Sequence, residues 1–215
     1  MGLFANLLIS VVLIVLSIAV FSADLGRLYS TVSTPVTNGN VRLKNVSLMI
    51  CVESETDGFA VDTFLNALSV RQASATFFVC GGFVMKNFKR VKDIYALGFE
   101  LGNLGFSGKS FKTLPAAKQK DEILDTHTLV KGLVGVDMKL FSPPNGEYTK
   151  DTLKTASALG YTVVLPSKPM EPPKNGDLIL VCPAKVAIQD FENLIDSYIR
   201  ADFCLIKVSD NIAAV

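Results

Sequence analysis

The stretch that decides the fold is "ASATFFVCGGFVMKNFKRVKDIYALGFELGN", residues 73–103. Its first part is a short apolar run that stops at a Gly-Gly pair, which predicts a buried strand and a turn. Residues 88–97 carry apolar side chains at helical spacing and stop before Gly98, as an amphipathic helix does. Residues 99–103 predict a second strand. Two strands joined by a helix indicate a β-α unit of a parallel sheet.

The same alternation continues on both sides of this stretch. Further strands are predicted within 46–52, 138–146, 161–167, 177–183 and 203–210, and further helices within 61–70, 112–135, 149–160 and 186–201. Such β-α units with short connections predict an α/β fold that closes like a barrel rather than a flat doubly wound sheet. In such a barrel the functional groups lie in the loops that follow the strands.

The beginning of the chain differs in character. From Gly2 to Ala23 no charged residue occurs, and a helix needs about 20 apolar residues to cross a bilayer. We expect a signal-anchor or transmembrane helix over residues 1–23, with a cleaved secretory signal as the alternative. Residues 24–44 are polar and rich in turn formers, which predicts a linker, and residues 45–210 form the folded domain. The domain is then expected outside the cytoplasm, either membrane-anchored or secreted.

Composition argues against several classes of function. The chain of 215 residues carries 21 Lys and Arg against 20 Asp and Glu, so its net charge of +1 gives no electrostatic reason to bind nucleic acid. No Walker-type or Gly-x-Gly-x-x-Gly loop opens a predicted helix, which argues against nucleotide binding. The four cysteines show no C-x-x-C spacing, and His127 is the single histidine.

The segments 73–103, 139–164 and 177–183 resemble, in order and spacing, the polysaccharide deacetylase family, which is the NodB-homology domain of carbohydrate esterase family four. The resemblance covers nearly all of residues 46–210 and is closest to the sporulation-associated, membrane-anchored branch. It implies a distorted, shortened (β/α) barrel. Active members are metal-dependent hydrolases that remove acetyl groups from N-acetylated sugars, acting on carbon–nitrogen bonds. One aspartate and two histidines hold the cation, and a second aspartate and a late histidine move protons.

In this sequence, most of those positions carry other residue types. The resemblance places the two histidine ligands on Leu104 and Gly108, which offer no donor atom. It places the arginine of the proline-rich loop on Ser142 and the general-acid histidine on Cys182. The resemblance therefore implies that the family metal, zinc or another divalent cation, has been lost, and we expect no cofactor.

The first loop of the family, which supplies the base and one metal carboxylate, can be aligned in two registers. One register puts Glu53 at the base and Ser54 at the metal position, and the other puts Cys51 and Val52 there. We favour the first. The vestigial catalytic positions are then Glu53, Ser142 and Cys182, and the vestigial binding groove comprises Glu53, Ser54, Asp57, Leu104, Gly108, Pro143, Pro144, Asn145 and Tyr148.

Three cysteines and several aromatic residues allow more than one interpretation. Cys51, Cys80 and Cys182 fall at predicted strand ends, where they are small buried residues, partners in a disulfide or a thiolate site for a soft metal. Phe106 and Tyr148 lie in loops and are candidates to stack on a sugar ring, with local packing as the simpler interpretation. His127 is expected to be solvated at a helix surface, far from the barrel mouth.

A further departure concerns the connection at residues 165–176. The family has a longer segment there that contains a helix, whereas three prolines in this short span leave no room for one, so one wall of the groove is expected to be missing. We expect a catalytically degenerate deacetylase-like protein of the cell envelope, which binds glycan or a protein partner in carbohydrate or cell-wall metabolism. The alternatives are an active hydrolase with an altered site built from Glu53, Asp57 or the cysteines, and a purely structural envelope protein.

Overall fold

The computed structural model describes residues 34–167 and 173–213. The predicted membrane segment, residues 1–23, lies outside the described residues, and so does the first part of the predicted linker. Within the described ranges, no helix has both the length and the apolar character needed to cross a bilayer.

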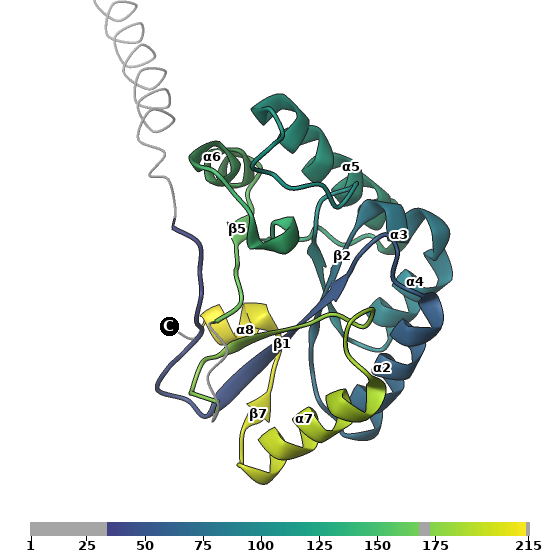
Figure 1. Ribbon diagram of the computed structural model, residues 1–215, viewed down its shortest axis with the longest axis vertical. Coiled ribbons are helices and arrows are strands. Elements are labelled where there is room, and N and C mark those ends of the chain that lie inside the picture. The colour runs from purple at the N-terminus through teal and green to yellow at the C-terminus, as the bar shows by residue number, and fades with distance from the viewer. Residues whose placement is uncertain (1–33, 168–172, 214–215) are drawn as a thin grey trace, which may run out of the picture. The chain divides into compact units, whose positions relative to one another are not determined.

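Strands and helices alternate along the chain, as the sequence predicts (Figure 1). The strands are β1 (Asn45–Val52), β2 (Thr76–Val79), β3 (Glu100–Asn103), β4 (Leu140–Phe141), β5 (Thr162–Val163), β6 (Leu178–Val181) and β7 (Cys204–Leu205). The helices are α2 (Gly58–Val70), α3 (Gly81–Lys86), α4 (Phe88–Ala96), α5 (Ala116–Val134), α6 (Lys150–Ala158), α7 (Ile188–Arg200) and α8 (Val208–Ala213), with a 3₁₀ turn at Pro144–Gly146.

The described strands form one seven-stranded sheet in the order β5-β4-β3-β2-β1-β6, and β7 also pairs with β1. Every strand pair is parallel. The fold is therefore a parallel α/β half-barrel. Because parallel strands all end at the same edge of a sheet, the loops that follow them share one end of the domain.

The two faces of the sheet bury different amounts of apolar surface. Side chains alternate along β1, so that Leu48 and Ile50 join the main core between sheet and helices, whereas Met49 and Cys51 join a smaller cluster on the inner face. In Figure 1, α2, α3, α4 and α5 lie along one side of the sheet. The sheet thus has helices on its outer face and a small apolar core on its inner face.

Residues 36–38, which fall in the predicted linker, lie between the two ends of the sheet. Val36 forms a parallel bridge with Val164, just after β5, and Asn38 forms an antiparallel bridge with Asp177, just before β6. We call residues 36–38, together with their backbone bridges to Val164 and Asp177, the seam. The buried Ser167 adds a further bond to it, since its hydroxyl donates to the carbonyl of Thr37 at 2.8 Å. The seam connects β5 and β6, which do not pair directly in the sheet order.

Two local predictions are wrong. The Gly-Gly pair after β2 is not a turn but the first residues of α3. The predicted strand at 203–210 is strand only at β7, and α8 begins at Val208. The cause lies in distant residues: the Thr76 hydroxyl and the Glu100 carboxylate accept the first backbone N–H groups of α8, at 2.9 and 3.2 Å, and so satisfy a helix start that local sequence does not encode.

Candidate functional site at the carboxyl end of the sheet

Two adjoining cavities lie at the carboxyl ends of the strands, with volumes of about 240 and 110 Å³. Both are lined by Cys51, Glu53, Leu104, Asn145 and Lys185. The larger cavity adds Ser54, Glu55, Ser107, Gly108 and Pro144, and the smaller adds Ser142, Pro143, Gly146, Pro166, Leu180 and Cys182. The parallel sheet therefore brings together most of the residues that the sequence singled out.

Glu53 and Lys185 form an ion pair that lines both cavities. Glu53 follows β1, Lys185 lies in the loop after β6, and Lys185 Nζ is 3.1 Å from Glu53 Oε1. Their side chains are 34% and 59% exposed, so solvent weakens the pair. The hydrogen bond and the charge of Glu53 raise the pKa of Lys185. Sequence reasoning missed Lys185, although its position three residues beyond Cys182 in a strand-end loop was a usable signal.

Cys51 and Cys182 lie beside each other under this ion pair. Their sulfur atoms and a Glu53 oxygen are all within 4.8 Å of one another. The hydrogen bond to Cys182, together with burial, raises the pKa of the Cys51 thiol. The same hydrogen bond lowers the pKa of Cys182, and the Lys185 charge acts in the same direction. All four cysteines belong to the described chain and are free thiols there.

Cys80 does not join this pair. Its sulfur lies 3.0 Å from the Ser54 hydroxyl and donates to the carbonyl of Phe106 at 2.7 Å, so it connects the loops that follow β1 and β3. Val52 is fully buried in the main core on the helix side. Val52 therefore points away from the cavities, whereas Glu53 and Ser54 both line the larger one.

The loop after β3 has no metal-binding side chain at the two histidine positions. Leu104 is 3% exposed and packs in the inner apolar cluster. Gly108 has φ +74°, a left-handed conformation that side-chain-bearing residues rarely adopt. Glycine at 108 is thus favoured by the backbone conformation of the loop, which the sequence alone did not reveal.

Asn103 and Glu122 hold this loop in place. The Asn103 amide is fully buried, donates to the Ile123 carbonyl at 2.8 Å and accepts from the Gly105 N–H at 2.8 Å. The Glu122 carboxylate on α5 accepts from Phe106 N at 2.7 Å and from Ser107. The loop shape therefore depends on hydrogen bonds within the protein. Glu122 was also missed, because its partners lie fifteen or more residues away in the sequence.

The prediction of a solvated His127 is wrong. Its ring bonds to the Tyr161 hydroxyl through Nδ1 and to Asp137 through Nε2 at 3.0 Å, and its side chain is only 20% exposed. The Tyr161 hydroxyl in turn accepts from the Asn103 amide at 3.1 Å, so the single histidine supports the loop from beneath. Burial raises the pKa of Tyr161 to about 12.

Two predicted groove residues, Asp57 and Tyr148, and the stacking candidate Phe106 lie outside both cavities. Asp57 caps the start of α2, where its carboxylate accepts from the Phe59 N–H at 3.2 Å. Tyr148 packs against the main core. The Phe106 ring lies against Gly81, where an added Cβ would be 2.3 Å from a ring carbon. Asp57 is therefore a helix cap, and the two aromatic rings are placed by local packing rather than by the cavities.

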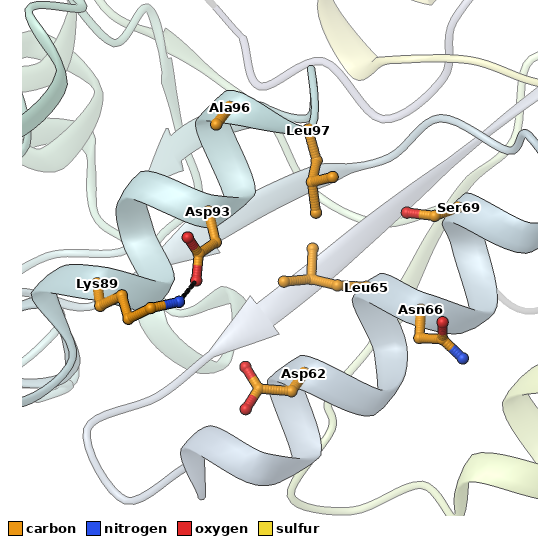
Figure 2. A pocket seen from close by; sticks show the side chains of 8 residues that line it. All are labelled: Asp62, Leu65, Asn66, Ser69, Lys89, Asp93, Ala96 and Leu97. Carbon is orange, nitrogen blue, oxygen red and sulfur yellow. Dashed lines mark hydrogen bonds and ion pairs between the residues drawn. The ribbon is translucent and has the colours of Figure 1, made fainter.

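A separate groove of about 500 Å³ runs between α2 and α4 on the outer surface (Figure 2). Leu65 and Leu97 face each other across it, and Lys89 pairs with Asp93 at 2.7 Å along α4. None of its lining residues is among those predicted for the site. The candidate site is therefore at the carboxyl end of the sheet and not in this groove.

This fold and site define an α/β-barrel domain whose cavities open at the carboxyl end of a parallel sheet. The sequence model of the family described as polysaccharide deacetylase matches residues 47–164, and the chain belongs to this family. It is the NodB-homology domain of carbohydrate esterase family 4 that the sequence resembles.

Comparisons with individual proteins agree with this assignment. The uncharacterized protein YlxY of Bacillus subtilis is 26% identical over 177 residues, which cover 75% of this chain and 55% of YlxY. A peptidoglycan-N-acetylglucosamine deacetylase of Bacillus cereus is 32% identical over 108 residues, 50% of each chain. A solved wild-type pseudoenzyme of carbohydrate esterase family 4 from Bacillus anthracis superposes with a TM-score of 0.77 at 19% identity, over 83% of this chain and 71% of that one. This chain spans about half the length of the curated relatives it matches.

The family metal can be compared with the residues that the sequence resemblance places at its ligand positions. Ser54 offers one hydroxyl, which is already 3.0 Å from the Cys80 sulfur. Leu104 and Gly108 offer no donor atom, whereas a zinc ion in a protein needs at least three nitrogen, sulfur or oxygen ligands. These three residues do not fit the family metal. No reaction step through that metal can be built on them.

Proposed function

We propose that the chain is a catalytically degenerate polysaccharide deacetylase-like protein of the cell envelope, which binds cell-wall glycan or an envelope protein. The observation that carries the proposal is that Leu104 and Gly108 stand where the family has its two histidines. The loop that contains them is held by hydrogen bonds to Asn103 and Glu122. Without the cation, the amide of an N-acetyl group is not polarised and no metal-bound water is activated. The family reaction therefore lacks the cation that polarises the amide and the metal-bound water that attacks it. With cysteine at 182, it also lacks the histidine that acts as general acid.

The retained architecture supports binding rather than loss of all function. The cavities persist beside the proline-rich loop, and Asn145 lines both of them. The described residues of the connection between β5 and β6, 164–167 and 173–177, contain no helix, which agrees with a groove open on that side. An open groove suits a long polymer or a protein surface better than a small molecule enclosed on all sides.

The cellular location belongs to the same proposal. The relatives named as peptidoglycan deacetylases act, by their names, on peptidoglycan, so a domain outside the cytoplasm is expected. The apolar segment 1–23 would anchor it there, or would be removed as a secretory signal. A place in sporulation rests on the sequence resemblance. The solved Bacillus anthracis relatives include a pseudoenzyme and a mutant of it described as having restored enzymatic activity, so degeneracy has a precedent in this fold.

Two assays on purified protein test the proposal. The first measures acetate release from peptidoglycan and chitooligosaccharide in the presence of divalent cations, and no release above buffer is expected. Sustained release would favour the altered-site hydrolase. The second measures co-sedimentation with insoluble peptidoglycan, which is expected if glycan is the ligand.

A matched pair of variants locates any binding. Glu55 is exposed and lines the larger cavity, so Glu55→Trp should block a ligand there. Lys89→Trp places the same ring on the outer groove between α2 and α4 and should leave sedimentation unchanged. If the wild-type chain does not sediment, an envelope protein is the next ligand to test, and cross-linking from residue 55 should capture it. If neither ligand is found, the structural envelope role is favoured.

A further inference from the structure

The register between β1 and β6 brings Cys51 and Cys182 together. β1 and β6 are parallel neighbours, and Ile50 pairs with Val181 in their register. The next pair in this register is Cys51 with Cys182. Paired residues on parallel strands point to the same face, and both cysteines belong to or pack against the inner apolar cluster. The two thiols therefore share one fixed position at the inner edge of the sheet.

Glu53 completes a group of three donor atoms. It lies two residues beyond Cys51, on the same face of the chain leaving β1. Its carboxylate oxygen and the two sulfur atoms lie within 4.8 Å of one another. Bond lengths of about 2.3 Å to sulfur and 2.1 Å to oxygen would place donor atoms roughly 3.5–3.8 Å apart around a tetrahedral zinc ion. The upper bound of 4.8 Å exceeds that spacing by about 1 Å, which side-chain rotation has to close.

We propose that Cys51, Cys182 and Glu53 form a binding site for a soft or borderline divalent cation, with Zn²⁺ as the best match. Two thiolates select against Mg²⁺ and Ca²⁺, which take oxygen ligands. The site uses none of the three family ligand positions, so it is a different site and goes beyond the proposed function. The fourth position faces the cavity of about 110 Å³, which Cys182 and Ser142 line, and is open to water or a ligand.

Lys185 balances the charge of this site. Two thiolates and one carboxylate carry three negative charges, and a divalent cation leaves one of them uncompensated. The Lys185 ammonium, 3.1 Å from Glu53 Oε1, supplies the missing positive charge. Glu53 Oε1 is 3.1 Å from Lys185 Nζ and 3.9 Å from the Cys51 sulfur, so the same oxygen faces both groups. A carboxylate has two oxygens, so rotation of Glu53 would let one oxygen bind the cation while the other keeps the bond to Lys185. With the cation present, the site as a whole is close to neutral.

The test uses the full chain, reduced and freed of metal, with its four thiols counted before metal is added. One Zn²⁺ per chain is expected in competition with a chromophoric chelator. With Co²⁺ as the probe, thiolate-to-metal charge-transfer absorption is expected. Cys182→Ser and Cys51→Ser should each weaken Zn²⁺ binding by roughly 100-fold or more, since even changes in outer-shell residues cost about 10- to 100-fold. Cys204→Ser, which removes an exposed thiol from β7, should leave the affinity unchanged.

Three outcomes would overturn the site. They are no stoichiometric Zn²⁺ in the reduced chain, Zn²⁺ binding that survives Cys51→Ser with Cys182→Ser, and a Cys51–Cys182 disulfide that persists in reducing buffer. Circular dichroism of each variant shows whether it is folded, and Glu53→Gln gives a variant that keeps both thiols. Acetate release separates the two proposals. Zn²⁺ binding without release supports both, whereas Zn²⁺-dependent release keeps this site and overturns the degenerate-enzyme proposal.

Discussion

Ser107 donates both its backbone N–H and its hydroxyl to the carboxylate of Glu122, at 2.7 and 2.6 Å. A third bond comes from Phe106 N, so one side chain of α5 fixes the loop that would carry the family histidines. Hydrogen bonds to a charged acceptor contribute more net stability than neutral ones, about 1.5–3 kcal/mol each after exchange with water. The loop geometry therefore persists without a metal ion.

Removing this acceptor should loosen the loop. We expect Glu122→Ala to lower the free energy of unfolding by about 2 kcal/mol, because two backbone N–H groups lose their partner. Urea denaturation measures the change. Asp125→Ala is the control on the same helix, since Asp125 is exposed, and it should change stability by less than about 0.5 kcal/mol. Equal effects of the two variants would contradict the assigned role of Glu122.

Asn103 should be among the polar residues most sensitive to substitution. Asn103→Leu removes three buried hydrogen bonds, to the Ile123 carbonyl, the Gly105 N–H and the Tyr161 hydroxyl, although Tyr161 keeps its bond to His127. The expected loss is about 2–4 kcal/mol in the free energy of unfolding. Tyr161→Phe removes one of these partners and should cost less, about 1 kcal/mol. A larger effect of Tyr161→Phe would mean that the phenol, not the amide, organises the network.

Tyr161 also predicts an alkaline transition. Burial raises the pKa of its phenol to about 12 from an ordinary value of 10.0, so folding favours the neutral form. The stability that depends on the neutral phenol is fully present below pH 10 and is lost as the pH rises from 10 toward 12. Ultraviolet titration of phenolate should show one tyrosine ionising after the others. Tyr161→Phe should remove that last step, and its persistence would assign it to another residue.

Arg71 and Asp196 predict an acidic dependence. The hydrogen bond from Arg71, 2.7 Å from Nε to Oδ1, lowers the pKa of Asp196 below its ordinary value of 3.8. A carboxylate whose pKa is depressed by folding stabilises above its unfolded pKa, and this contribution is lost as the pH falls through the folded value. The Tm difference between wild type and Asp196→Asn should therefore be larger at pH 7 than below pH 4.

Restoring the family ligands tests the site alignment. In a chain that carries Cys51→Ser and Cys182→Ser, the set Ser54→Asp, Leu104→His and Gly108→His should raise Zn²⁺ affinity sharply. Gly108→His places a side chain at φ +74°, which costs about 1–2 kcal/mol of stability. Gly108→Ala carries the same backbone strain without a ligand and is the matched control. No gain in affinity over that control would mean that the alignment of these loops is incorrect.

The sequence predicted the β-α alternation and the gathering of Glu53, Leu104 and Ser142 at one end, because parallel topology sends every strand end to the same edge. It could not predict α8, whose start is satisfied by Thr76 and Glu100 from other strands. Lys185 was missed for a similar reason. Its importance comes from a partner 132 residues away, and no local pattern encodes such a contact.

His127 is a second residue whose role depends on contacts with residues distant in the sequence. A lone histidine on a long helix is usually solvated, and nothing near it in the sequence argues otherwise. Its partners, Tyr161 and Asp137, approach only when α5 packs against the segments that precede β5 and β4. Local pattern fixes where a residue sits on its own helix, while tertiary contacts decide what that residue does.

The seam at residues 36–38 has a consequence for aggregation. Val36 and Asn38 bond to the backbone beside β5 and β6, the two ends of the sheet order. A chain cut at residue 45 would keep every strand of the sheet yet leave those backbone groups without a cover. Exposed strand edges pair with other chains, so the shortened protein should self-associate where the longer one does not. A segment whose sequence is typical of a linker would then protect the open edges of the half-barrel from pairing with other chains.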